Sequence, residues 1–181
     1  KYGLNGKHIL LGVASIWSRE KGFDDCIQMA DFLHPDEMLV LVGVRPEQQK
    51  KLKKNMLGIP RTENIHQLAE LYAAADAFIN PTWQDNYPTV NLEAIACGTP
   101  VVTYRTGGSI EAITDQTGFI VPQGNVKEML EAARLISQRG KAYYQQPCRT
   151  YALENFRKED RYQDYLDLYD KLTERNPSAN I

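Results

Sequence analysis

The stretch "DAFINPTWQDNYPTVNLEAIACGTPVVTY" (residues 76–104) contains the pattern that decides the fold class. A short apolar run at 76–80 predicts a buried strand, and a polar turn follows it. Pro88 suits the first position of a helix, where its missing N–H costs nothing, so we expect a helix from there to about Cys97. The "CGTP" turn then leads into a second strand at 100–104. A strand, a helix and another strand in this order predict one βαβ unit of a parallel sheet.

The same alternation continues on both sides of this unit. Further strands are expected at 8–15, 38–43, 55–59 and 118–122. Helices are expected around Gly22–Leu33, in the lysine-rich segment after Pro46, at 64–75, in "GGSIEAI", at 125–137 with Asn125 as its cap, and twice within 141–175. The sequence therefore predicts an α/β fold: a Rossmann-like, doubly wound parallel sheet of about six strands with helices on both faces.

Length and composition narrow the class of protein. With 181 residues, 43% hydrophobic and 24% charged, the chain has the size of one domain or of one half of a two-domain protein. We interpret residues 1–181 as a single domain with a core over about 1–140 and C-terminal helices over 141–181. The chain begins without methionine and enters a strand almost at once, which is typical of one domain of a longer protein. A formal net charge of −2 gives no indication of a nucleic-acid-binding surface.

The cysteines and histidines give no sign of a metal site. Cys26 and Cys97 fall in apolar helical contexts, which indicates reduced thiols in a cytoplasmic compartment. His8, His34 and His66 lie far apart and lack the spacing of metal ligands. We therefore expect no zinc ion.

Two carboxylates stand near the start of the helix that follows Pro88. A doubly wound sheet binds its ligands at the carboxyl ends of the strands, and Asp85 lies in such a loop. Glu93 lies five residues beyond Pro88, roughly 7.5 Å along the helix, and the free amides near Thr89 and Val90 favour an anion between the two acids. This arrangement suits an elongated ligand with hydroxyls at both ends and phosphates between, as in a nucleotide-sugar. The alternative is that Asp85 caps the turn and Glu93 faces solvent.

Two other loops add groups suited to phosphate. Lys21 opens the helix after the first strand, where a lysine can neutralise a diphosphate and Gly22 allows close backbone approach. Gly107 and Gly108 form a turn before Glu111, which suits a phosphate or a sugar hydroxyl. The simpler interpretations are a solvated lysine at a helix start and a plain strand-to-helix connection. No GxGxxG or P-loop motif is present.

Several motifs in order resemble a known family. They are "EKGFDD", "AELYAAADAFINPT", the D-x7-E pair, "AIACGTPVV", "TGGSIE" and "TGFIVPQGN". Together they resemble the donor-binding domain of GT-B glycosyltransferases, above all the retaining family 4, also called glycosyl transferases group 1. The resemblance runs from about Leu10 to Ile136.

The resemblance implies roles for the acids and the helix start. Glu93 matches the second acid of the family's E-x7-E motif, which holds the ribose hydroxyls of the nucleotide. Asp85 matches the first acid, a catalytic residue that contacts the donor sugar near the reacting centre, but it is one methylene shorter than the usual glutamate. The amides of Thr89 and Val90 would hold the diphosphate.

The resemblance also implies roles in the other loops. Lys21 matches the family lysine that binds phosphate, and we count it with Asp85 as catalytic. The family arginine five residues earlier is replaced by Ile16, so we expect Arg19 to substitute. Gly43 lies in the loop under the nucleotide, and Arg61 lines the base.

For the full-length protein, the resemblance implies a retaining, metal-independent transferase. It would move a hexose-type sugar from a UDP- or GDP-sugar to a glycan or lipid-linked acceptor in bacterial polysaccharide synthesis, in the cytoplasm or at the inner face of the plasma membrane. The N-terminal acceptor domain is expected to be absent from this chain, which should then be inactive alone. The basic segment 48–55 suits anionic lipid, although a solvated helix face is the simpler interpretation.

Two rival classes share this fold. A GT-B epimerase or phosphorylase would share this half and differ in the other one. A non-catalytic module such as a signalling receiver needs acids after the first strand and a phosphorylatable aspartate after the third, which "LGVASIW" and "LGIPRT" lack.

The C-terminal segment carries a helical stripe of apolar residues, formed by Tyr162, Tyr165, Leu166 and Tyr169. Core packing would explain this stripe. In GT-B enzymes the last helix often crosses to the partner domain, and the absence of that domain would leave the stripe partly exposed.

Overall fold

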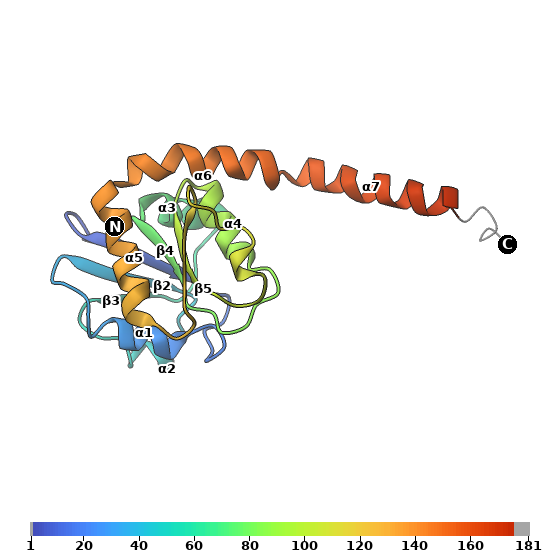
Figure 1. Cartoon of the computed structure of the whole chain (residues 1–181). Helices are drawn as coiled ribbons and strands as arrows, with labels where there is room; N and C mark the ends of the chain where they lie inside the picture. Colours follow the sequence, from blue (N-terminus) through green and yellow to red (C-terminus); the bar gives the residue numbers. More distant parts are fainter. Residues whose placement is uncertain (1, 176–181) are drawn as a thin grey trace.

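Six parallel strands form one sheet in the computed structural model, which describes residues 2–175 (Figure 1). The strands are β1 (His8–Val13), β2 (Glu37–Val42), β3 (Met56–Ile59), β4 (Ala77–Asn80), β5 (Val101–Tyr104) and β6 (Gly118–Val121). Their order in the sheet is β3-β2-β1-β4-β5-β6. The predicted doubly wound sheet is confirmed, with each strand end within two residues of its expected position.

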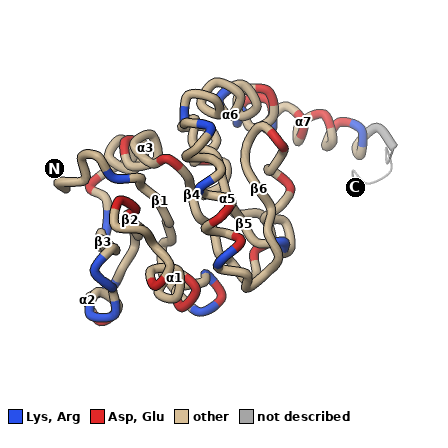
Figure 2. The backbone as a smooth tube through the Cα atoms, turned by 60° about the vertical axis from the view of Figure 1, so that its left-hand side comes forward, with Lys and Arg blue, Asp and Glu red and all other residues tan. Residues whose placement is uncertain are grey.

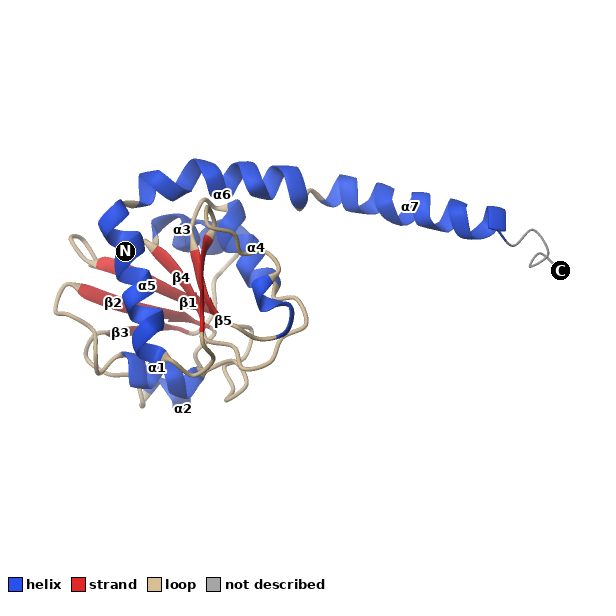
Figure 3. Cartoon of the chain, viewed as in Figure 1, coloured by secondary structure: helices blue, strands red, loops and turns tan. Residues whose placement is uncertain are grey.

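Helices cover both faces of the sheet (Figure 3). They are α1 (Phe23–Met29), α2 (Pro46–Gln49), α3 (Ile65–Ala74), α4 (Thr89–Ala96), the 3₁₀ turn η1 (Gly107–Ile110), α5 (Val126–Arg139), α6 (Lys141–Asn155) and α7 (Lys158–Arg175). On one face, α5 packs against α1 and against β4, β5 and β6. On the other, α3 packs against β1, and α4 against β4 and β5. α6 crosses from α5 to pack on α4.

The strand order reverses next to β1, which pairs with β2 on one side and with β4 on the other. Because the connections after β1 and β4 leave in opposite directions, a crevice opens at the carboxyl ends of these strands. The strands beneath it are almost entirely buried: Leu11, Leu41, Phe78 and Ile79 are inaccessible to solvent. The crevice therefore rests on a rigid apolar floor.

The lysine-rich helix expected after Pro46 is much shorter than predicted. α2 ends at Gln49, and the four lysines of 50–54 lie in turns and irregular backbone between α2 and β3 (Figure 2). Lysines three or four residues apart on a helix repel one another. Lys53 instead donates to Asp31 at 2.6 Å.

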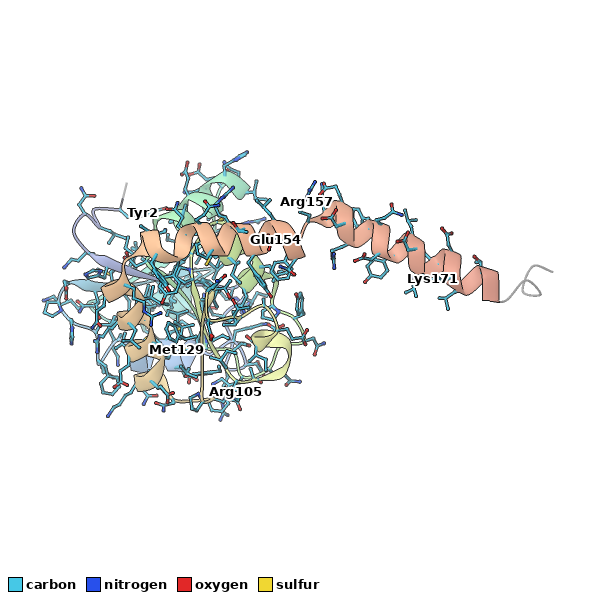
Figure 4. All side chains as sticks on the ribbon, turned by 45° about the horizontal axis from the view of Figure 1, so that its top comes forward. Tyr2, Arg105, Met129, Glu154, Arg157 and Lys171 are labelled. Carbon is cyan, nitrogen blue, oxygen red and sulfur yellow. The ribbon has the colours of Figure 1, made fainter. Side chains whose placement is uncertain are left out.

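The last helix leaves the body of the domain. In Figure 1 α7 extends from the end of α6 away from the sheet, and Figure 4 shows its side chains, including Lys171, standing clear of the core. Tyr162, Tyr165, Leu166 and Tyr169 are all more than half exposed. The stripe is thus uncovered in this chain and does not serve as core.

Candidate functional site

A cavity of about 650 Å³ lies at the carboxyl ends of β1, β2 and β4. Its lining includes the loop after β1, the end of β2, the segment before α3, and the first turns of α4. Seven of the predicted site residues line it: Lys21, Gly43, Arg61, Asp85, Thr89, Val90 and Glu93. The structure therefore brings together, in one cavity, predicted site residues up to 72 positions apart in the sequence, from Lys21 to Glu93.

The N-terminus of α4 opens into the cavity. The helix begins at Thr89, one residue later than expected, and Pro88 is its N-cap with extended backbone (φ −70°, ψ 109°) and no capping side chain. The first amides of a helix have no partner within the helix. Thr89 and Val90 line the cavity, so their end of the helix presents a positive field to any ligand there.

Buried polar side chains fix α4 against the sheet. Asn80 Nδ2 donates to Asn91 Oδ1 at 2.8 Å, and Asn91 Nδ2 donates to the Ser109 carbonyl at 3.0 Å. Thr103 Oγ1 donates in turn to the Asn80 carbonyl at 3.0 Å. All four residues are buried, so each of these bonds would be costly to lose. Sequence reasoning missed Asn91, although an asparagine inside "TVNLEAIA" was a visible signal.

Lys21 and Asp85 form an ion pair in the cavity lining. Lys21 Nζ donates to Asp85 Oδ2 at 2.5 Å, which joins the loop after β1 to the loop after β4. The lysine side chain is 41% exposed and the aspartate side chain 16% exposed. An ammonium group has three N–H donors, and Asp85 uses one of them. Lys21 can therefore hold Asp85 and an anionic ligand at the same time.

Glu93 also lines the cavity and accepts a hydrogen bond from a tyrosine. The Tyr72 hydroxyl, on α3, donates a hydrogen bond to Glu93 Oε2 at 2.9 Å. Burial raises the pKa of Tyr72 far above its usual value, and the negative charge of Glu93 raises it further. The phenol is therefore a permanent donor. Sequence reasoning missed this contact, because the two residues lie 21 positions apart on different helices.

Gly43 is required by close backbone contact under the cavity. It has φ +93°, and a Cβ there would lie 1.8 Å from the Ala14 carbonyl oxygen. Trp17, which also lines the cavity, donates its indole N–H to the Val42 carbonyl at 2.8 Å. These contacts bring the end of β2 close to the loop after β1.

Gly107 and Gly108 pack against the loop that carries Asp85. A Cβ on Gly107 would lie 2.2 Å from the Asp85 carbonyl oxygen, and one on Gly108 would lie 1.7 Å from the Asn86 carbonyl oxygen. The Gly108 amide donates to the Asp85 carbonyl at 3.1 Å. Neither glycine is among the residues that line the cavity. The structure thus gives them a part in placing Asp85, and their contact with phosphate or sugar stays a prediction.

The two arginines predicted for the site differ in position. Arg61 lines the cavity beside Pro60 and Thr62. Arg19 is exposed and is not part of the lining, and Ile16, which stands where the family has its arginine, is 51% exposed. The substitution of Arg19 for that arginine stays a prediction.

A buried aspartate anchors the Asp85 loop from behind. Asp25 of α1 accepts the Trp83 indole N–H at Oδ2 and the Tyr104 hydroxyl at Oδ1, each at 2.8 Å. Burial raises the pKa of Tyr104, and its hydrogen bond to Asp25 raises it further. Sequence reasoning quoted this aspartate only as part of "EKGFDD" and assigned it no role.

Residues 2–175 contain neither a cluster of metal ligands nor a membrane-spanning helix. Within them, no group of three or more His, Cys, Asp or Glu side chains is placed to hold a metal ion. Metal independence stays a prediction. None of the described helices has the length and apolar character needed to cross a bilayer.

The fold and the cavity define the class: a Rossmann-like domain with a cavity where the strand order reverses. Residues 7–138 match the family described as Glycosyl transferases group 1, and the chain belongs to that family. The predicted resemblance to the donor-binding half of a GT-B glycosyltransferase is therefore confirmed.

Curated relatives agree with this assignment. The chain is 31% identical over 175 residues to the lipopolysaccharide glucosyltransferase WaaG of Escherichia coli, covering 90% of this chain and 44% of that protein. It is 37% identical over 78 residues to a D-inositol 3-phosphate glycosyltransferase of Mycobacteroides abscessus, covering 42% of this chain and 18% of the relative. The chain thus spans less than half the length of these curated relatives.

Solved structures show the same fold. A sucrose-phosphate synthase from Thermosynechococcus elongatus has a TM-score of 0.79 at 23% identity, covering 95% of this chain and 47% of that one. Anabaena HepE in complex with UDP-glucose has a TM-score of 0.78 at 19% identity, covering 93% of this chain and 50% of that one. Both alignments cover nearly all of this chain and about half of the other.

Proposed function

We propose that this chain binds the nucleotide and diphosphate of a sugar donor for a glycosyltransferase. The full-length protein would move a hexose-type sugar from a UDP- or GDP-sugar to a glycan or lipid-linked acceptor, with retention and without a metal ion. The acceptor-binding half lies outside this chain in our proposal, so the chain alone binds donor without turnover. The family supports the reaction class, and the neighbour that binds UDP-glucose supports the donor class.

One observation carries the proposal: opposite charges and a helix N-terminus line one cavity. Lys21 and Asp85 form an ion pair in its lining, and Glu93 and the first amides of α4 belong to the same lining. A nucleotide-sugar needs hydroxyl acceptors at its two sugars and positive groups at its phosphates. The cavity of about 650 Å³ falls within the ordinary range for small-molecule sites.

Charge development explains how these groups would assist transfer. The bond between the sugar's anomeric carbon and the diphosphate breaks, and negative charge grows on the leaving phosphate. The acceptor oxygen bonds to the sugar, and its proton passes to the leaving phosphate. Lys21 and the α4 amides are preorganised donors for that charge. Asp85 remains tied to Lys21 and would contact the donor sugar, with the acceptor delivered by the other half of the protein.

Calorimetric titration tests donor binding directly. Wild type is titrated with UDP, GDP and ADP and with UDP-glucose and GDP-mannose, and Glu93→Ala is compared. Because a carboxylate that binds hydroxyls contributes about 1.5–3 kcal/mol, the variant should bind the preferred nucleotide at least about tenfold more weakly. Glu70→Ala removes an exposed glutamate of α3 outside the cavity lining and should bind as wild type does.

Two results would contradict the proposal. If wild type binds no nucleotide, or if Glu93→Ala binds nucleotide as well as wild type does, the donor site does not lie in this cavity. Robust sugar transfer or donor hydrolysis by this chain alone would contradict the assignment of turnover to both halves together.

A further inference from the structure

We propose that Tyr72 is a positioning residue that orients Glu93 toward the ribose and so sets the preference for ribonucleotides over deoxyribonucleotides. This inference rests on the donor-binding function proposed above and adds a residue outside the cavity lining. Its basis is the hydrogen bond from the Tyr72 hydroxyl to Glu93 Oε2, at 2.9 Å.

The Tyr72 ring is fixed in place. Only 1% of the residue is exposed, and its ring packs against Phe78 of β4 with centroids 5.4 Å apart. Thr99 Oγ1 donates to the Tyr72 carbonyl at 2.6 Å, which ties the end of α3 to the turn before β5. A tyrosine has two side-chain torsions, and here both the backbone and the ring are held. The hydroxyl therefore points at one place.

The hydroxyl acts as a donor at every working pH. A phenol carries one hydrogen, and in the described part of the chain its hydrogen bond goes to Glu93 alone. Burial raises the pKa of Tyr72, and the charge of Glu93 raises it further, so the phenol stays neutral. A neutral donor leaves the full negative charge on Glu93, whereas a lysine or arginine partner would neutralise it.

This bond restricts a side chain that would otherwise be free. Glu93 lies on an exposed position of α4 and has three side-chain torsions. With Oε2 held by Tyr72, the remaining lone pairs, including all those of Oε1, stay available to neighbouring hydroxyls. The 2′- and 3′-hydroxyls of a ribose are such a pair, and bonds to a carboxylate are the strong, charge-assisted kind. Holding the carboxylate in place before binding reduces the entropy lost on binding.

Tyr72→Phe tests the inference with little risk to folding. The substitution removes one oxygen and keeps the ring contact with Phe78, and Glu93 can be solvated because it is exposed. Wild type and variant are titrated with UDP and 2′-deoxy-UDP, and with GDP and 2′-deoxy-GDP. We expect wild type to prefer the ribonucleotide by about tenfold and Tyr72→Phe to lower that preference about threefold or more.

Two further variants complete the test. Tyr144→Phe removes the hydroxyl of another buried tyrosine, in α6, and should leave the preference unchanged. The double variant Tyr72→Phe/Glu93→Ala should match Glu93→Ala, because the hydroxyl acts only through that carboxylate. The melting temperature of each variant separates this effect from a loss of fold.

The outcomes distinguish this inference from the function beneath it. If Tyr72→Phe keeps the wild-type preference while Glu93→Ala loses it, Tyr72 has only a structural role and the inference is overturned, while the donor site stands. If adding Tyr72→Phe to Glu93→Ala changes the ribonucleotide preference as much as adding it to wild type does, Tyr72 does not act through Glu93. The inference is then overturned as well. If wild type binds none of the four nucleotides, the proposed function itself fails.

Discussion

The two acids of the cavity are held in opposite ways. Asp85 lies in a loop and is paired with Lys21, a partly exposed cation from another loop. Glu93 lies on a helix and is bonded to Tyr72, a neutral and buried phenol. An ion pair near the surface is screened by salt and can exchange partners, whereas a buried donor cannot move away. We infer that the Asp85 end of the cavity is adjustable and the Glu93 end is rigid.

This difference fits the parts of the donor that each end would meet. The ribose is the same in every donor of a given nucleotide and suits a fixed carboxylate. The sugar and its diphosphate change charge during transfer and need groups that can follow that change. Because Lys21 has donors left beyond its bond to Asp85, it can respond to the phosphate without releasing the loop.

The largest expected effect comes from disturbing the backbone behind Asp85. In Gly108→Ala the new Cβ would lie 1.7 Å from the Asn86 carbonyl oxygen, so backbone must move and the bond from the Gly108 amide to Asp85 is strained. We expect a loss of about 3 kcal/mol in the free energy of unfolding, measured by urea denaturation. The ratio between the affinities for ribonucleotides and for 2′-deoxyribonucleotides should stay as in wild type, because the Glu93 end is untouched.

Gly58→Ala is the matched control for that variant. Its Cβ would also meet close atoms, but these are the side-chain ends of Gln49 and Leu52, which can turn away. Its cost should therefore be clearly smaller. Equal costs for both variants would show that the backbone contact of Gly108 does not hold the Asp85 loop.

A smaller effect is expected when the cation at the adjustable end is removed. Lys21→Met keeps most of the side-chain length but leaves Asp85 unpaired and the diphosphate without an ammonium group. We expect the affinity for UDP or GDP to fall about tenfold at low salt and less at 0.5 M salt, since screening already weakens the wild-type interaction. Titrations at two salt concentrations measure this change.

The rigid end gives the contrast for the same experiment. The effect of Tyr72→Phe should vary little with salt, because a buried neutral donor is not screened. Lys50→Met, which removes an exposed lysine outside the cavity lining, should bind as wild type does at both salt concentrations. A salt dependence equal for Lys21→Met and Tyr72→Phe would contradict the distinction between the two ends.

The sequence was sufficient for the sheet because each strand is a local apolar run with a turn after it. The same reasoning overestimated the helix after Pro46, because propensity favours lysine in helices while four neighbouring lysines repel one another. Asp85, Glu93 and Lys21 could be found from loop position and motif spacing. That Lys21 bonds Asp85 could not, because the contact joins loops 64 residues apart.

The missed residues share one property: they act through a side chain on a different element. Tyr72 and Asp25 each lie on a helix, and the local sequence gives no sign of their partners. Their polar atoms reach Glu93 and Trp83 only after the helices have packed on the sheet. Periodicity indicates which residues face the core, but it does not indicate which polar atoms meet there.

The smallest expected effect concerns the anchor behind the Asp85 loop. Trp83→Phe removes the indole N–H that Asp25 accepts, while the aspartate keeps its bond from Tyr104. Because Trp83 is 43% exposed, we expect a loss of only about 1 kcal/mol in the free energy of unfolding, measured by urea denaturation. A looser loop should weaken the binding of UDP-glucose about twofold more than that of UDP, since Asp85 would meet the sugar.

Tyr104→Phe removes the other donor to Asp25 and checks the same anchor from the next strand. It should likewise weaken the binding of UDP-glucose more than the binding of UDP. Tyr143→Phe, on the exposed side of α6, should change neither affinity. If both anchor variants instead weaken UDP and UDP-glucose equally, Asp25 supports the whole cavity. The loop of Asp85 would then move together with the Glu93 end, and the division into an adjustable and a rigid end would be wrong.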